Sequence, residues 1–269
     1  MTATPLPGAT RPTSGSAIRS TARARAVRTY LRLELRRMLR DRRTLVFSLL
    51  VPPAVFLWVG ASAEHQVTEI GPGTNLTASL LVSVALYGAL LTATSGGAGV
   101  AVERAQGWTR QLRLTPLEPW TYVLVKVLAS MAIGAASVLV TFAAGWFGGA
   151  QMPTSAWVLC PLIAWCGSLV FSAFGLLMGY VLPTESVLKY LNLILIGLSF
   201  AGGLFLPFSD GTPMATISQV MPTYGLAELA RAPLGSGPVE IAAVVNVVAW
   251  AAIFLTGAAW RFRTDTARV

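Results

Sequence analysis

The stretch LTASLLVSVALYGALLTATSGGAGVAV, residues 76–102, contains no charged side chain and ends abruptly at Glu103. An apolar run of about 20 residues is long enough to cross the hydrocarbon core of a bilayer as an α-helix. The later half is rich in small residues, and Gly96, Gly97 and Gly99 let a neighbouring helix approach closely. The stretch therefore predicts a transmembrane helix that packs against other helices.

The rest of the chain has the same character. Of the 269 residues, 54% are hydrophobic and 12% are charged, and the mean hydropathy is +0.64. A soluble globular domain has about 25% charged residues. We predict an all-α membrane protein with one domain, residues 25–263, whose first span is bent by Pro52 and Pro53. Six transmembrane helices are expected at about 44–61, 76–102, 122–147, 156–182, 187–206 and 239–260.

The positive charge is concentrated before the first span. The net charge is +9, and eleven of the twenty Lys and Arg residues lie between Arg11 and Arg43. This position favours a membrane-surface anchor over a nucleic-acid site. With the N-terminus in the cytoplasm, 19 of the 20 basic residues fall on the cytoplasmic side of the six spans, and Arg231 is the exception. By the positive-inside rule, this asymmetry predicts that both termini are cytoplasmic.

The N-terminal region divides into two segments. Residues 1–24 are rich in Pro, Ser, Thr and Arg, and we predict a disordered cytoplasmic tail, although the composition also resembles that of a transit peptide. Residues 25–41 place apolar residues opposite a stripe of arginines, which predicts an amphipathic helix in the membrane interface. A solvated basic helix is the alternative. The stripe, which would contact lipid phosphates, consists of Arg28, Arg32, Arg36 and Arg40.

Two further segments remain, the C-terminal end and the segment between the last two spans. Residues 264–269 are predicted to be a short cytoplasmic tail. The segment between the last two spans is too apolar for a plain loop, and prolines such as Pro207 and Pro222 interrupt it. We expect two short helices there, one through Ile217 and one starting at Tyr224, that re-enter the outer leaflet. A surface loop with interfacial residues is the alternative.

The residues needed for catalysis are missing. Nucleotide hydrolysis requires a G-x-x-x-x-G-K-[ST] loop, and neither lysine of this chain follows a glycine. No HExxH motif occurs, His65 is the only histidine, and both cysteines lie in one apolar run. We therefore expect no enzyme activity, no cofactor and no metal. The scarcity of ionisable residues in the spans argues against a proton-driven carrier or a channel with a polar pore.

The loop after the second span is the segment best suited to contact a soluble protein. Residues 103–117 are charged and amphipathic, and the sequence predicts a short exposed helix that ends before Pro116. A membrane protein without its own energy source needs such a contact if a partner is to move it. A loop that only fixes the topology is the alternative.

Three segments carry a recognisable pattern in a fixed order. They are the arginine-rich helix before the first span, the loop 103–117 with an acidic-basic pair, a glycine and a basic helix ending in Thr-Pro-Leu, and the stretch 202–224. Together they resemble the permease subunits of type 2 ATP-binding-cassette (ABC) exporters, which include daunorubicin-resistance permeases. The resemblance assigns coupling to a partner to Glu103, Arg104, Gly107, Trp108, Arg110, Leu112, Arg113 and Pro116.

The resemblance implies a coupling helix docked on a separate cytoplasmic ABC ATPase subunit, which would bind the ATP and Mg²⁺. It also implies a second permease copy, in a homodimer or heterodimer, in the plasma membrane of a bacterium. The apolar spans favour a hydrophobic or amphipathic substrate, with drugs and antibiotics first and lipids or glycolipids second. The rival from another class is a membrane immunity or interaction protein that transports nothing.

The charge asymmetry generates a topology prediction. In a background with Cys160 and Cys166 replaced by alanine, a cysteine at Ser16 or Thr109 should react only with a membrane-permeant reagent. A cysteine at Thr68 should react with an impermeant reagent added outside. Labelling of the Thr109 position from outside would contradict the six-span topology.

Overall fold

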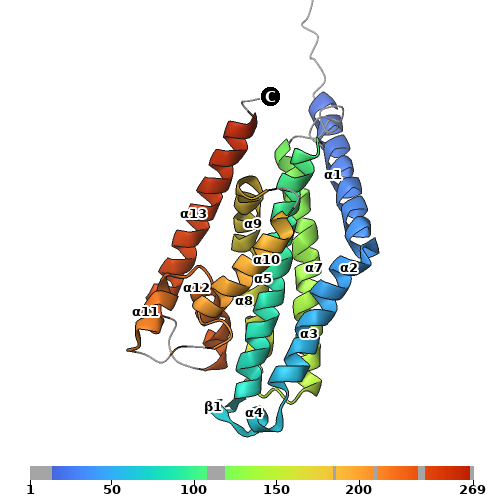
Figure 1. Cartoon of the computed structure of the whole chain (residues 1–269). Helices are drawn as coiled ribbons and strands as arrows, with labels where there is room; N and C mark the ends of the chain where they lie inside the picture. The colour runs from blue at the N-terminus through green and yellow to red at the C-terminus, as the bar shows by residue number, and fades with distance from the viewer. Residues whose placement is uncertain are drawn as a thin grey trace, which may run out of the picture.

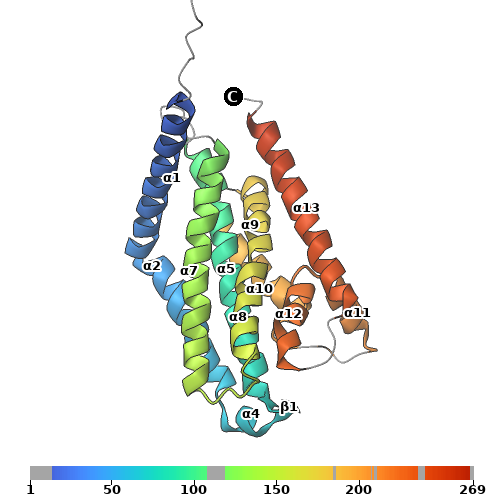
Figure 2. The ribbon, with the colours of Figure 1, turned by 180° about the vertical axis from the view of Figure 1, so that it is seen from behind.

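A bundle of long helices forms the protein. The computed structural model describes residues 14–107, 119–183, 186–206, 208, 211–235 and 240–266. Helix α5 (Leu76–Ala105) runs through the centre of the bundle. It packs along α7 (Pro119–Phe147) and α9 (Leu169–Val181), and Figures 1 and 2 show all three running along the long axis. Most of α5 is therefore buried by other helices of the same chain.

The helices confirm an all-α membrane protein. Four helical segments are long and apolar enough to cross a membrane, namely α5, α7, the pair formed by α8 (Ala156–Gly167) and α9, and α13 (Ile241–Thr266). Two shorter apolar helices, Val46–Gly60 and α10 (Val187–Ala201), coincide with the expected first and fifth spans. The number of helices that cross the bilayer stays a prediction.

The first expected span is irregular around its two prolines. Helix α2 (Arg42–Leu45) is followed by the π-helical turn η1 (Val46–Leu50), the short helix α3 (Val51–Val55) and a second π-helical turn, η2 (Phe56–Gly60). Pro52 and Pro53 occupy the first turn of α3, where the missing N–H donors are tolerated. The wider π-helical turns on either side accommodate the disrupted hydrogen-bond ladder.

The fourth and fifth expected spans show details that the sequence did not predict. The fourth keeps its expected extent but is interrupted between α8 and α9 at Ser168, about two turns after Pro161, which lies inside α8. The fifth ends at Ala201 instead of residue 206. Gly203 has φ +68°, a left-handed conformation that stops a helix and that glycine adopts without strain.

Helical structure extends into both segments that were predicted to be tails. Helix α1 (Ser14–Arg40) begins inside the segment predicted to be disordered, because the alanines and arginines of residues 17–26 are strong helix formers. Residues 1–13 lie outside the described residues. Helix α13 continues to Thr266, so the predicted tail 264–269 begins within a helix. Figure 1 places the start of α1 and the end of α13 at the same end of the bundle.

Small residues bring α5 and α9 unusually close. A Cβ atom added at Gly97 would lie 2.0 Å from the carbonyl oxygen of Ser172, and one added at Gly175 would lie 2.0 Å from that of Thr94. Backbone therefore meets backbone at this crossing, as expected for helices that associate through small residues. The glycine-rich end of the second span supplies one side of this contact.

Several buried hydroxyl groups form hydrogen bonds inside their own helix. Ser83 donates to the carbonyl oxygen of Ser79 at 3.0 Å, and Thr92 donates to that of Gly88 at 2.8 Å. Thr141 of α7 donates in the same way to the residue four positions earlier, at 2.8 Å. These side chains are polar without needing a partner from another helix.

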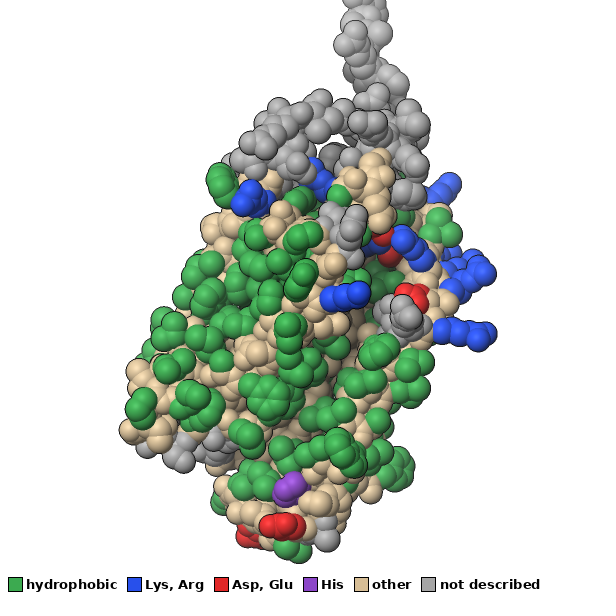
Figure 3. All heavy atoms as spheres, in the orientation of Figure 1, with side chains coloured by type: hydrophobic (Ala, Val, Ile, Leu, Met, Phe, Trp, Pro, Cys, Tyr) green, Lys and Arg blue, Asp and Glu red, His purple; other side chains and the backbone are tan. Residues whose placement is uncertain are grey.

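The two ends of the bundle differ in charge. Figure 3 shows Lys and Arg side chains gathered at the end that holds α1, and the histidine side chain at the opposite end. The opposite end contains α4 (Ala63–Val67) and a small hairpin of β1 (Glu69–Gly71) and β2 (Thr74–Asn75). The Asn75 side chain accepts hydrogen bonds from the Ala78 and Gln151 amides and donates to Gly149, which ties two loops to the start of α5.

The segment before α13 contains the two short helices expected there. They are α11 (Pro213–Val220) and α12 (Tyr224–Arg231), followed by a 3-10 turn, η3 (Ala232–Leu234). Helix α12 packs against α5, α8 and α13 and lies within the height of the bundle. Pro222 is buried in the turn between the two helices, and Pro207 lies outside the described residues. The depth of this hairpin in a bilayer stays a prediction.

The close crossing of α5 and α9 generates a stability prediction. Gly97→Ala should lower the free energy of unfolding by about 1–3 kcal/mol, because the new methyl group meets a carbonyl oxygen that belongs to a packed helix. Thermal unfolding of the detergent-solubilised protein measures the change. Gly99→Ala is the matched control, since no atom lies within 4 Å of the added Cβ, and it should be neutral or stabilising. Equal effects of the two substitutions would contradict the packing argument.

Candidate functional site: a charged cluster beside the expected coupling loop

The basic end of the bundle is where the expected coupling loop begins and ends. Helix α5 stops at Ala105 and α7 starts at Pro119, so the loop joins the ends of two neighbouring helices. Gly107 has φ +82° and terminates α5 in a left-handed conformation. The last turn of α5 carries Glu103 and Arg104, the first two residues of the expected coupling segment.

A buried ammonium group joins three helices at this end. Lys126 of α7 lies 2.7 Å from Glu103 Oε1 of α5 and 2.5 Å from Glu34 Oε1 of α1, measured from its Nζ. The exposed fractions of the three side chains are 8%, 13% and 7%. A buried charge is stable only when it is paired, so each of these residues requires the others.

Two further groups complete the environment of Glu103. Arg37 of α1 donates to Glu103 Oε1 at 2.7 Å, and the Tyr122 hydroxyl donates to Glu103 Oε2. Tyr122 also stacks on Tyr30 of α1, with ring centroids 6.1 Å apart. Burial, and then the nearby charges of Glu34 and Glu103, raise the pKa of Tyr30 above its ordinary value, so this phenol keeps its proton.

The neighbouring residue Arg104 extends the connections to α9. Its Nη1 atom donates to the Tyr180 hydroxyl at 2.8 Å, and its guanidinium carbon lies 5.5 Å from the centre of that ring. A guanidinium at this distance is attracted by the ring face. Glu103 and Arg104 therefore attach the end of α5 to α1, α7 and α9. We name Glu34, Arg37, Glu103, Arg104, Tyr122, Lys126 and Tyr180 the charged cluster.

Helix α1 shows the two faces that the sequence predicts. The stripe of arginines is exposed on one side, while Glu34 is buried on the other, against α7. Figures 1 and 2 show α1 running beside the first turns of α7. Contact of the stripe with lipid phosphates stays a prediction. The exposed arginines are Arg28, Arg32, Arg36 and Arg40.

Sequence reasoning found only part of the charged cluster. It identified Glu103 and Arg104 but did not place Glu34, Arg37, Tyr122, Lys126 or Tyr180 beside them. One signal was present. Glu34 is the only acidic residue among the arginines of residues 25–40.

The rest of the predicted coupling segment is not described. Gly107 lies in the turn after α5. Trp108, Arg110, Leu112, Arg113 and Pro116 lie outside the described residues. In the described part of the chain, no group of three His, Cys, Asp or Glu side chains is placed to hold a metal ion.

Comparison with known proteins identifies the family. The sequence profile described as "ABC-2 type transporter" matches residues 25–234, which include the short helices α11 and α12 and the whole charged cluster. This chain belongs to the ABC-2 type transporter family. The permease is also similar to a protein from Bacillus subtilis (strain 168) named "Putative transport permease YvfS". The two are 26% identical over 205 residues, which cover 74% of this chain and 82% of the relative.

The family gives the charged cluster a context. The chain is the membrane subunit of an ABC transporter, a multi-pass protein that is not itself catalytic, and the family implies an ATPase partner. The segment that joins α5 to α7 is bordered on both sides by the charged cluster. Residues on both sides of this segment therefore belong to the contacts that join α1, α5 and α7.

Removing the buried ammonium group should strongly destabilise the permease. Lys126→Met leaves the buried Glu34 carboxylate without its ion-pair partner and leaves Glu103 with Arg37 alone, and we expect a loss of about 3–5 kcal/mol in the free energy of unfolding. Adding Glu34→Gln to this variant should recover part of the loss. The other lysine of the chain, Lys189, is exposed, and Lys189→Met should change stability by less than about 0.5 kcal/mol. Thermal unfolding in detergent compares the variants, and equal effects at the two lysines would contradict the role of the cluster.

Proposed function

We propose that the permease exports a hydrophobic or amphipathic substrate, using ATP hydrolysed by a separate cytoplasmic ABC ATPase subunit. The observation that carries this proposal is the position of the charged cluster. It borders the coupling segment and joins α1, α5 and α7, so a movement of the docked ATPase would displace three helices together. The basic end of the bundle is then the cytoplasmic end, in agreement with the positive-inside rule.

The substrate class follows from the scarcity of charge inside the bundle. Among the described residues, the buried charged side chains are Glu34, Lys126 and Arg231. The first two are paired in the charged cluster, and Arg231 donates to the carbonyl oxygens of Ala227 and Gly203 and contacts Glu228. A polar ion would find few free partners among these groups, whereas a lipophilic compound needs none. We propose a drug or antibiotic, with a lipid or glycolipid as the second candidate.

The assembly would contain a second permease copy and two ATPase subunits. A homodimer or a heterodimer with a related permease would form the transport path between the two copies. The name of the Bacillus subtilis relative, a transport permease, supports transport over a non-transporting immunity protein. The exposed arginines of α1 would hold the assembly at the phosphate layer of the inner leaflet of a bacterial plasma membrane.

The coupling residues generate a functional prediction. In the co-purified complex, Glu103→Ala, or Arg110→Glu combined with Arg113→Glu, should weaken ATPase association or separate ATP turnover from transport. Glu103→Ala would act through the charged cluster, where it leaves Lys126 and Arg37 without one of their carboxylate partners. The reversed charges at Arg110 and Arg113 would be unpaired at the interface, which costs a few kcal/mol and corresponds to a loss of at least about tenfold in affinity. ATP turnover is measured against a panel of lipophilic compounds and compared with transport into inside-out vesicles.

Two controls make the result specific. Arg19 lies in the N-terminal region before the charged cluster, so the Arg19→Glu variant should leave the complex intact. The purified permease alone should hydrolyse no ATP, because the chain has no phosphate-binding loop. Normal association and transport by the Glu103 and Arg110/Arg113 variants would remove the coupling role of this loop. A wild-type complex that transports no lipophilic compound and no lipid would favour the immunity protein.

A further inference from the structure

The hairpin of α11 and α12 contains backbone groups that helices cannot satisfy by themselves. The last four carbonyl groups of a helix and its first four N–H groups have no partner inside the helix. In this hairpin the end of α11 and the start of α12 are separated only by residues 221–223. Unsatisfied groups of this kind are costly wherever water is excluded.

Helix α13 supplies the missing partners. Asn246 Nδ2 donates to the carbonyl oxygens of Gln219 and Met221, at 2.7 Å and 3.1 Å. The indole nitrogen of Trp250, one turn later, donates to the carbonyl oxygen of Val220 at 2.9 Å. Three consecutive carbonyl groups at the end of α11 are thus bonded by two side chains of α13.

Asn246 also caps α12. Its Oδ1 accepts a hydrogen bond from the Gly225 amide, in the first turn of α12, at 3.3 Å. The usual capping residue, Thr223, accepts no such bond, and its hydroxyl donates to the carbonyl oxygen of Leu198 in α10 at 2.7 Å. A helix-capping role normally filled by the residue before the helix has therefore passed to Asn246 of another helix.

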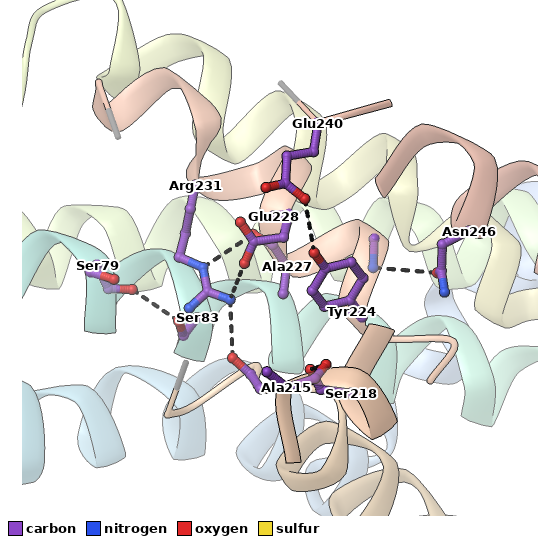
Figure 4. A network of polar contacts seen from close by, with 12 residues as sticks. Ser79, Ser83, Ala215, Ser218, Tyr224, Ala227, Glu228, Arg231, Glu240 and Asn246 are labelled. Atoms are coloured by element: carbon purple, nitrogen blue, oxygen red, sulfur yellow. Dashed lines mark hydrogen bonds and ion pairs between the residues drawn. The ribbon is translucent and has the colours of Figure 1, made fainter. Parts of the chain in front are cut away.

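The same contact requires a glycine. A Cβ atom added at Gly225 would lie 2.4 Å from the carbonyl oxygen of Ala243 in α13 and 2.9 Å from Asn246 Oδ1. Asn246 is itself 9% exposed. Figure 4 shows Asn246 and Arg231 at opposite ends of α12, with Tyr224, Ala227 and Glu228 between them.

The opposite end of α12 is bonded to a different part of the bundle. Arg231 Nη2 donates to the carbonyl oxygen of Gly203, just after the end of α10, at 3.0 Å. Because the carbonyl end of a helix carries partial negative charge, a guanidinium is favourable there. Arg231, the exception to the positive-inside count, thus has a local structural role. Helix α12 is bonded to α10 through Thr223 and Arg231 and to α13 through Asn246.

We propose that Asn246 is a positioning residue that fixes the hairpin to α13, so that α11, α12 and α13 move as one unit during transport. This proposal rests on the proposed export function. One side chain bonds the end of α11, the turn and the start of α12, and Trp250 adds a fourth hydrogen bond. A displacement of α10 then reaches α13 through α12.

The first experiment measures the hairpin directly. In the full complex, hydrogen exchange of the amides of residues 219–226 is compared between the wild type, Asn246→Leu and Trp250→Phe. Asn246→Leu removes three hydrogen bonds at similar volume and should accelerate exchange at least about tenfold, whereas Trp250→Phe removes one bond and should give a smaller increase. Exchange in α5, residues 76–105, should not change.

Thr256→Val is the matched control. It removes a hydroxyl from the same helix, but this hydroxyl donates to Ala252 and Ile253 within α13. The control should leave exchange in the hairpin as in the wild type. Equal exchange in the wild type and Asn246→Leu would overturn the proposal, as would an equal acceleration by Thr256→Val.

The second experiment separates positioning from a general need for folding. Asn246→Leu should lower the number of substrate molecules transported per ATP at least about fivefold while ATPase association stays normal, because the charged cluster lies at the other end of the bundle. Loss of ATPase association in parallel with transport would overturn the positioning role. A wild-type complex that exports nothing would contradict the proposed function. The exchange experiment needs no substrate, so it would still test the hydrogen bonds between Asn246 and the hairpin.

Discussion

Three helices meet on the ammonium group of Lys126, and the basic end of the permease depends on this contact. The group is enclosed by Glu34 and Glu103 and is far too costly to bury alone. Each carboxylate comes from a different helix, so α1, α5 and α7 are held at one relative position. Arg37 and Tyr122 then complete the hydrogen bonds of Glu103. The segment that we propose as the ATPase contact therefore emerges from a rigid base.

A contrasting arrangement holds the opposite end of the bundle. There, apart from the hydrogen bonds and ion pair of Arg231, the contacts are made by neutral amides and hydroxyls to backbone groups, as at Asn75 and Asn246. Such bonds contribute modestly in a membrane, about 0.6 kcal/mol on average. They can be exchanged for other partners more easily than a buried ion pair can. The permease thus combines a firmly paired basic end with an opposite end held by weaker, more numerous contacts.

The sequence predicts the helices better than it predicts their partners. Continuous apolar runs such as 76–102 mark helices directly, and the prolines and glycines near residues 202–224 mark the hairpin. The ends of α1 and α10 were wrong, because helix propensity continues through the alanine- and arginine-rich start and a glycine stops α10 early. The charged cluster could be predicted only at Glu103 and Arg104. Its other members lie far away in sequence, and pairing between helices leaves no periodic signal.

The hydroxyl groups that bond within their own helix have a consequence for the order of synthesis. Helix α5 is made before α7 and α9, its main packing partners, yet Ser83 and Thr92 are satisfied from the moment the helix forms. These two hydroxyls therefore need no neighbouring helix when α5 enters the lipid. The Asn246 side chain, in contrast, forms its hydrogen bonds with the hairpin of α11 and α12 and not within its own helix. The hairpin precedes α13 in the chain, so its partners have already left the ribosome when this asparagine reaches the membrane.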